Sequence, residues 1–187
     1  MYAHRTAPMI VGGLVSVLVL LGGCGTAPER GTAPGPTATA VGPGVFNAAD
    51  AAFVRALLPH HRQGVEIAEI GAARTTRADV KILAQAIVAT QQDEVTRMQG
   101  WLGAWKQATA APAPAAGAKK IAALRTASAG FDEKFLDLLI AHQRQAVKLA
   151  QSEQAGGKNP AALAFARQIV QSRTAEIDQM LAFLSKT

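Results

Sequence analysis

Two adjacent histidines, His60 and His61, are the side chains of this sequence whose type and position best suit chemistry. They fall within residues 53–69, where apolar and small residues recur at alternating spacings of four and three. That spacing is typical of an amphipathic helix with one buried face. It predicts that His60 lies on the buried face and that His61 lies about 100° around the helix, at the second edge of the apolar side. Because imidazole nitrogen binds copper, zinc, iron and nickel, the pair is a candidate metal site.

Polar residues also interrupt the apolar face of the next predicted helix, at residues 78–105. Glu94 lies on that face, and Met98 follows it about one turn later. If the two helices form an antiparallel hairpin, Glu94 comes within a turn of the level of His60. Glu94 would then act as a ligand or as a carboxylate that orients a ligand. A metal ion could be held by imidazole, carboxylate and thioether groups from His60, His61, Glu94 and Met98.

The same residues allow an interpretation without a metal. A buried histidine paired with a carboxylate can form a hydrogen-bonded network that specifies which helices pack together. A methionine at a core position, such as Met98, is also typical of packing. From the residues alone, the metal site and the packing network remain alternatives.

The histidine-containing segment returns later in the chain, at residues 132–150. Adding 82 to a residue number maps the first segment onto the second, and this offset continues without a gap into the following helix. A constant offset over roughly 55 residues indicates an internal duplication, with a period longer than that of solenoid repeats. Pairs related by the offset include Phe53 and Phe135, His60 and His142, Glu94 and Glu176, and Met98 and Met180.

The two copies are not equivalent in their polar residues. Gln143 stands where the first copy has His61, and Arg173 replaces a glutamine. A guanidinium group near His142 would repel a bound cation, and we expect Arg173 to pair with Glu176, three residues further on. The sequence therefore predicts that a metal site lies in the first copy, with His142 and Glu176 as a supporting set in the second.

The elements that must position these residues are four long helices. Aromatic residues make up 5% of the chain and alanine is abundant, which favours closely packed helices over a sheet. The predicted helices are 47–73, 78–105, 131–153 and 161–184, and a short helix is expected at 119–127. Hairpin one covers 47–105, a long crossover covers 106–130, and hairpin two covers 131–187. This order predicts an all-α, ferritin-like four-helix bundle over residues 46–187, with pseudo-two-fold symmetry.

The first 45 residues indicate export. Residues 1–23 have the features of a signal peptide, with an apolar run of 12 residues at 10–21 that is too short to span a bilayer. The sequence Leu21-Gly22-Gly23-Cys24 resembles a bacterial lipobox, which implies cleavage before Cys24 and lipid attachment to that residue. An ordinary signal peptide with an incidental cysteine is the alternative. Residues 24–45 are rich in Pro, Gly, Thr and Ala, which predicts a disordered tether that holds the folded domain away from the membrane. The expected location is outside the cytoplasm, anchored by lipid to the cell membrane.

Charge and motifs argue against two other function classes. The net charge is +6, but the basic residues are scattered and have no aromatic platform beside them, so we expect no nucleic-acid partner. No Ser-His-Asp set, phosphate-binding loop or CxxC motif is present. Neither Glu94 nor Glu176 is followed by the histidine of a Glu-x-x-His di-iron motif. We therefore expect a protein that is not an enzyme.

Residues 53–68 and 84–102 resemble the bacterial family catalogued as domain of unknown function 305. The resemblance covers residues 50–105 well and residues 132–184 as a weaker second copy. It implies a ferritin-like helical bundle that is often exported, with some members associated with copper binding or copper tolerance. The positions that carry the motif are His60, His61, Gln91, Glu94 and Met98.

One departure from the family pattern bears on the metal. The family often has methionines before and after the histidine pair, where this chain has Leu57, Leu58 and Ile67. Imidazole and carboxylate without thioether groups suit Cu(II) or zinc better than Cu(I). The sequence thus predicts a lipid-anchored bundle that binds a transition metal, copper ahead of zinc, for sequestration or tolerance. The alternative is a structural or protein-interaction module of the cell envelope with a buried His–Glu packing network.

Overall fold

The computed structural model describes residues 44–108 and 115–186. The predicted signal peptide at 1–23, Cys24 and the tether up to residue 43 lie outside the described residues. Within the described ranges the secondary structure is entirely helical, which confirms the predicted all-α class. The helices are α1 (Ala48–Arg74), α2 (Ala78–Ala104), α3 (Ala115–Thr126), α4 (Phe131–Gly156) and α5 (Pro160–Leu184).

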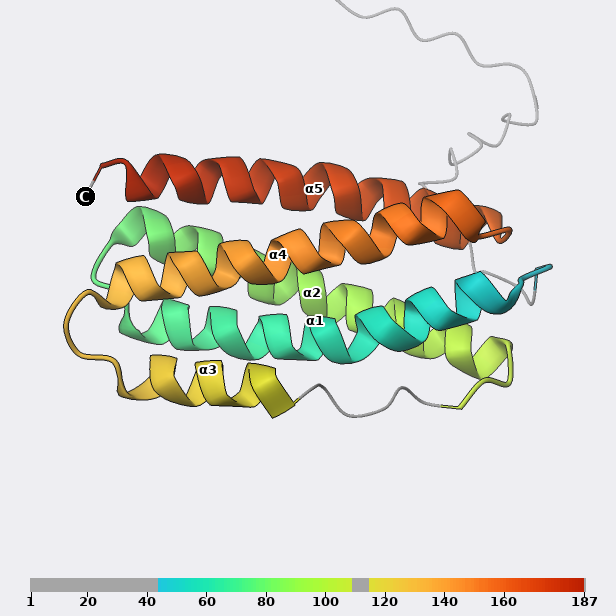
Figure 1. Cartoon of the computed structure of the whole chain (residues 1–187), viewed down its shortest axis with the longest axis horizontal. Helices are drawn as coiled ribbons and strands as arrows, with labels where there is room; N and C mark the ends of the chain where they lie inside the picture. Colours follow the sequence, from blue (N-terminus) through green and yellow to red (C-terminus); the bar gives the residue numbers. More distant parts are fainter. Residues whose placement is uncertain (1–43, 109–114, 187) are drawn as a thin grey trace, which may run out of the picture. The chain divides into compact units, whose positions relative to one another are not determined.

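The four long helices form two hairpins that pack together as a bundle (Figure 1). Helix α1 packs along α2, and α4 packs along α5, with short turns at 75–77 and 157–159. The hairpins meet mainly through α1 and α4. The crossover carries the short helix α3, which begins four residues earlier than the helix expected at 119–127 and lies against α1 and α4.

Side-chain caps begin two of the four long helices, α1 and α5. The side chain of Asn47 accepts hydrogen bonds from the amides of Ala49 and Asp50, while the Asp50 carboxylate accepts from the Asn47 amide, so α1 begins with a complete capping box. The Asn159 side chain accepts from the first amides of α5 without a reciprocal bond, and Pro160 follows at the first helical position, where the missing amide costs nothing.

The interior consists of two apolar clusters with a polar layer between them. One cluster surrounds Phe135 and Met180, and the other surrounds Phe165 and Met98. Each long helix contributes apolar residues to both clusters and polar residues to the segment between them. The fully or largely buried members of this layer are His61, Gln91, Glu94, His142, Gln143 and Arg173. The candidate metal-site residues, apart from Met98, lie at or beside this level of the bundle.

Candidate functional site

A buried ionic network occupies the centre of the polar layer. The Nε2 atom of His61 lies 2.8 Å from a carboxylate oxygen of Glu94. The same oxygen accepts a hydrogen bond from the guanidinium of Arg173, which is fully buried. A second guanidinium nitrogen of Arg173 lies 2.7 Å from Glu176, the pairing expected from the sequence. Arg173 therefore joins α2 and α5 as well as pairing within its own helix.

Two glutamine side chains extend the network to the remaining helix. Gln143 of α4 donates to Glu176 of α5, and its carbonyl oxygen lies 3.4 Å from the amide nitrogen of Gln91 of α2. With His61 from α1, the network includes side chains from all four long helices. A network of this kind restricts which helix faces can meet, because a shift in pairing leaves buried polar groups without partners.

The network changes the role that the sequence predicts for Glu94. Its carboxylate is compensated by the Arg173 guanidinium, which lies where a cation bound by Glu94 would lie. Met98 packs in the apolar cluster around Phe165. In the described part of the chain, no three His, Cys, Asp or Glu side chains come together as a metal site would require.

The structure instead brings His60 against His142 of the other hairpin. Their rings stack with centroids 3.7 Å apart and an interplanar angle of 25°. The Nε2 atom of His142 lies 3.0 Å from the backbone carbonyl oxygen of His60. Because a carbonyl oxygen can only accept, Nε2 of His142 carries the hydrogen and Nδ1 is left with its lone pair.

Both imidazoles are neutral at physiological pH. Burial, together with the neighbouring imidazoles, lowers the pKa of His60 to about 2. Burial and the nearby His61 lower the pKa of His142 to about 4. Both ring nitrogens of His60 and Nδ1 of His142 are buried and have no hydrogen-bond partner among the described residues. Unpaired buried nitrogen lone pairs are costly, and they are also the form of imidazole that binds metals.

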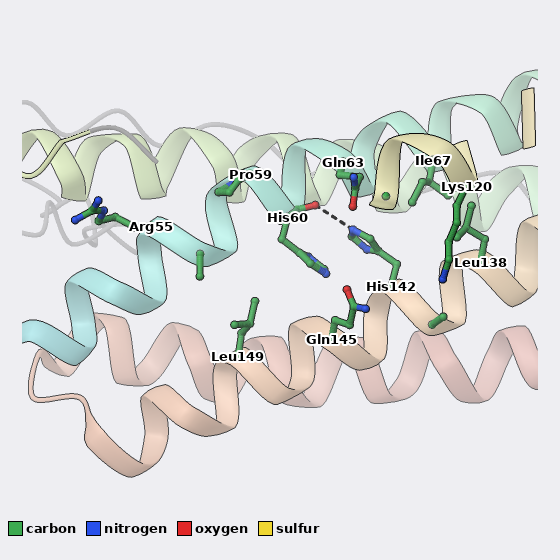
Figure 2. A pocket seen from close by; sticks show the side chains of 13 residues that line it. Arg55, Pro59, His60, Gln63, Ile67, Lys120, Leu138, His142, Gln145 and Leu149 are labelled. Carbon is green, nitrogen blue, oxygen red and sulfur yellow. Dashed lines mark hydrogen bonds between the residues drawn. The ribbon is translucent and has the colours of Figure 1, made fainter. Parts of the chain in front are cut away.

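These histidines form part of the wall of a cavity of about 490 Å³ between α1, α4 and α3. Figure 2 shows His60 and His142 side by side in this wall, with a dashed line for the hydrogen bond between the His142 ring and the backbone carbonyl oxygen of His60. The α1 and α4 residues of the wall come largely in pairs separated by 82 positions, as His60 and His142 are. The pairs are Ala56 and Leu138, Pro59 and Ala141, His60 and His142, Gln63 and Gln145, and Ile67 and Leu149.

The positions of the two adjacent histidines correct the sequence-based prediction. His61, predicted at the edge of the apolar side, is fully buried and faces α2. His60, predicted on the most buried stripe, is only partly buried and faces α4. Helical periodicity locates an apolar face but does not say which edge of that face meets which neighbouring helix.

Sequence reasoning also missed that His142 is the partner of His60. The signal that could have revealed it is the constant offset of 82 residues. When two similar hairpins pack around an approximate two-fold axis, equivalent positions near that axis contact each other. The same reasoning would have placed Gln63 and Gln145 in the wall of one cavity.

A bundle of two helical hairpins, with imidazoles at the interface between them, defines the class of this protein. The chain belongs to the family Domain of unknown function (DUF305), which matches residues 50–184. The comparison with curated proteins gives no match.

Solved structures support the same fold. A DUF305 fragment from Deinococcus radiodurans is 27% identical, with a TM-score of 0.69 over 75% of this chain and 98% of that chain. CopM in its Cu(I)-bound form is 26% identical, with a TM-score of 0.67 over 73% of this chain and 96% of that chain. CopM has also been solved in Cu(II)-bound and silver-bound forms. A DUF305 protein from Streptomyces coelicolor that is inferred to be secreted is 28% identical, with a TM-score of 0.68 over 74% of this chain and 91% of that chain.

None of the helices in residues 44–108 and 115–186 combines the length and the apolar character needed to cross a bilayer.

Proposed function

We propose that this protein is a non-catalytic bundle protein that binds a transition metal ion, with copper as the first candidate and zinc as the second. The similarity to CopM in copper-bound and silver-bound forms supports the choice of metal. Copper held by imidazoles would be withheld from other reactions, which is the chemistry that sequestration or tolerance requires.

The observation that carries the proposal is the stacked pair of His60 and His142. Three of their ring nitrogens are buried without partners, beside a cavity with room for an ion and further ligands. Imidazole suits copper and zinc, so these residues fit the proposed metal. Glu94 fits less well because Arg173 already compensates its charge. We therefore assign His60 and His142 as the ligands, and His61, Glu94 and Glu176 to the network that supports them.

The proposal includes export and attachment to the membrane through a lipid on Cys24. These parts rest on the sequence Leu21-Gly22-Gly23-Cys24, and a secreted relative is consistent with export. It also includes the origin of the two hairpins as duplicated copies, which the constant offset supports.

The test is a calorimetric titration of the full chain with Cu(II), Zn(II) and, without oxygen, Cu(I). We expect one tight site, and we expect His60→Ala and His142→Ala each to weaken binding at least about tenfold, or 1.4 kcal/mol. His61→Gln, which introduces the residue found at the equivalent position 143, should keep the site because His61 faces α2. If His61→Gln abolishes binding and His142→Ala does not, the ion is held within the first hairpin, as the sequence alone predicts. If no metal binds, the proposal is wrong.

A second function is favoured by the ionic network itself. His61, Glu94, Arg173 and Glu176 could serve only to specify helix pairing in a structural or interaction module of the cell envelope. The melting temperature separates the two functions, because an ion that binds only the folded state must raise it. No increase with any of the three ions, together with a lower melting temperature for His60→Ala, would favour the structural module.

A further inference from the structure

The cavity beside His60 and His142 is larger than a metal ion needs. Its volume of about 490 Å³ falls within the roughly 300–1,000 Å³ that is typical of small-molecule sites. Helices α1 and α4 form its two long walls, and the beginning of α3 closes part of the third side (Figure 2). A metal bound by imidazoles would leave most of this volume free.

The charged groups of the cavity wall are all positive. Lys120 of α3 lies near one end and Arg55 of α1 lies near the other, and the wall contains no Asp or Glu (Figure 2). Gly117, in the first turn of α3, is also part of the wall. The first amides of a helix carry a partial positive charge, so they add to the field of Lys120 at that end.

The rest of the wall is apolar, with a few neutral polar groups. The amides of Gln63 and Gln145 and the neutral imidazole of His60 can each donate one or more hydrogen bonds. An apolar slot with convergent donors and a cationic end suits a ligand that has an apolar body and one negative group. The apolar side chains of the wall are Pro59, Ile67, Leu138 and Leu149, together with Ala56 and Ala141.

We propose that this cavity binds a small organic anion, with a carboxylate beside Lys120 and the start of α3 and an apolar body between α1 and α4. A cationic ligand is disfavoured because no wall residue would balance its charge. The site goes beyond metal binding and does not require it, since Lys120 and the apolar walls take no part in holding the ion.

The probe for the test is octanoate, which combines a carboxylate with an unbranched apolar chain. The full chain is titrated by calorimetry with a chelator present, so that no metal contributes. Octylammonium has a similar body and the opposite charge, and acetate has the carboxylate without the body. We expect one saturable site for octanoate and at least about tenfold weaker binding of both comparison ligands.

Two variants assign the site to the cavity. Lys120→Glu should weaken octanoate binding at least about tenfold, whereas Lys119→Glu, the same charge change at the adjacent exposed position outside the wall, should not. Ala141→Phe fills the cavity without changing charge and should also abolish binding. Residues 119, 120 and 141 are all exposed, and a thermal melt of each variant verifies the fold.

The outcomes are separable from those of the metal titration. Metal binding without octanoate binding overturns this inference alone, and octanoate binding without metal binding leaves it standing. Equal binding of octanoate and octylammonium, or equal losses in Lys120→Glu and Lys119→Glu, would show nonspecific apolar association and overturn the inference.

Discussion

At the scale of single residues, Arg173 determines the chemistry of the centre of the bundle. Its buried guanidinium satisfies one oxygen of Glu94 and one of Glu176, so it acts as a built-in cation between α2 and α5. A buried carboxylate without such a partner carries a large desolvation cost. For this reason the proposed metal ligands are His60 and His142 and do not include Glu94.

Arg173→Met tests this account. Removing one partner of a buried ion pair leaves the other uncompensated, so we expect a loss of about 3 kcal/mol in the free energy of unfolding, measured by urea denaturation. Adding Glu94→Gln to Arg173→Met should recover part of that loss, because the more deeply buried of the two carboxylates left without the guanidinium is then neutral. If the single variant is as stable as the parent chain, the pair does not stabilise the fold.

At the scale of elements, α1 is the helix that joins the first hairpin to the crossover and to the second hairpin. It packs against α2, α3 and α4, and it carries both adjacent histidines. Its close contact with α4 requires Gly64, where an added Cβ would overlap the Gln91 amide and come within 2.8 Å of the His142 ring. The absence of a side chain at this position therefore allows α4 to approach and His142 to stack on His60.

Gly64→Ala should destabilise the protein by about 1–3 kcal/mol, because the added methyl group overpacks the polar layer. Gly100→Ala on α2 is the matched control, since a Cβ added there would have no neighbouring atom within 4 Å. The control should be neutral or should stabilise by up to about 1 kcal/mol, because alanine favours the helix. Thermal melts of the two variants provide the comparison, and equal melting temperatures would contradict the predicted close contact.

At the scale of the whole bundle, the two hairpins are tied together where α1 begins. The amides of Lys158 and Asn159, in the turn between α4 and α5, donate to Asp50 at 3.0 and 2.8 Å. Burial would raise the pKa of Asp50, but hydrogen bonds from backbone amides and from Glu153 hold it below its usual value. Burial, and then the bond to Asp50 and its charge, raise the pKa of Glu153 to about 8. At neutral pH the Glu153 carboxyl of α4 therefore stays protonated beside the Asp50 carboxylate of α1.

This pair predicts a pH dependence of stability. The ordinary pKa of a glutamate carboxyl is 4.5, and the pKa of Glu153 in the folded protein is about 8, so between these values the folded protein binds the extra proton. Stability must then fall as pH rises through this window. The histidines in the polar layer have lowered pKa values, so their effect has the opposite sign, but it is largely complete by pH 7 because the ordinary pKa of histidine in the unfolded chain is 6.5.

Glu153→Gln keeps the hydrogen-bonding shape of the protonated side chain and removes its titration. We expect the free energy of unfolding to fall from pH 7 to pH 8 in the parent chain and to stay nearly constant in the variant. Urea denaturation at the two values measures the difference. A parent chain whose free energy of unfolding rises over this interval would contradict the raised pKa of Glu153.

The helices could be predicted from the residues because their signals are local. The spacing of apolar residues located four long helices, and Asn47 and the Gly156–Pro160 segment marked a start and a turn. The long crossover separated two hairpins, and the polar residues on apolar faces marked the level at which chemistry would occur. These features depend on neighbours within one or two turns of the same helix.

The contacts between helices could not be predicted in the same way. A period of about 3.6 residues defines a buried face, but it does not say which neighbour that face meets. Only the packed bundle turns His61 toward Glu94 and His60 toward His142, and only there does Arg173 reach Glu94 across 79 positions of the chain. The cavity exists for the same reason, because its walls combine α1 with α3 and α4, which follow much later in the chain.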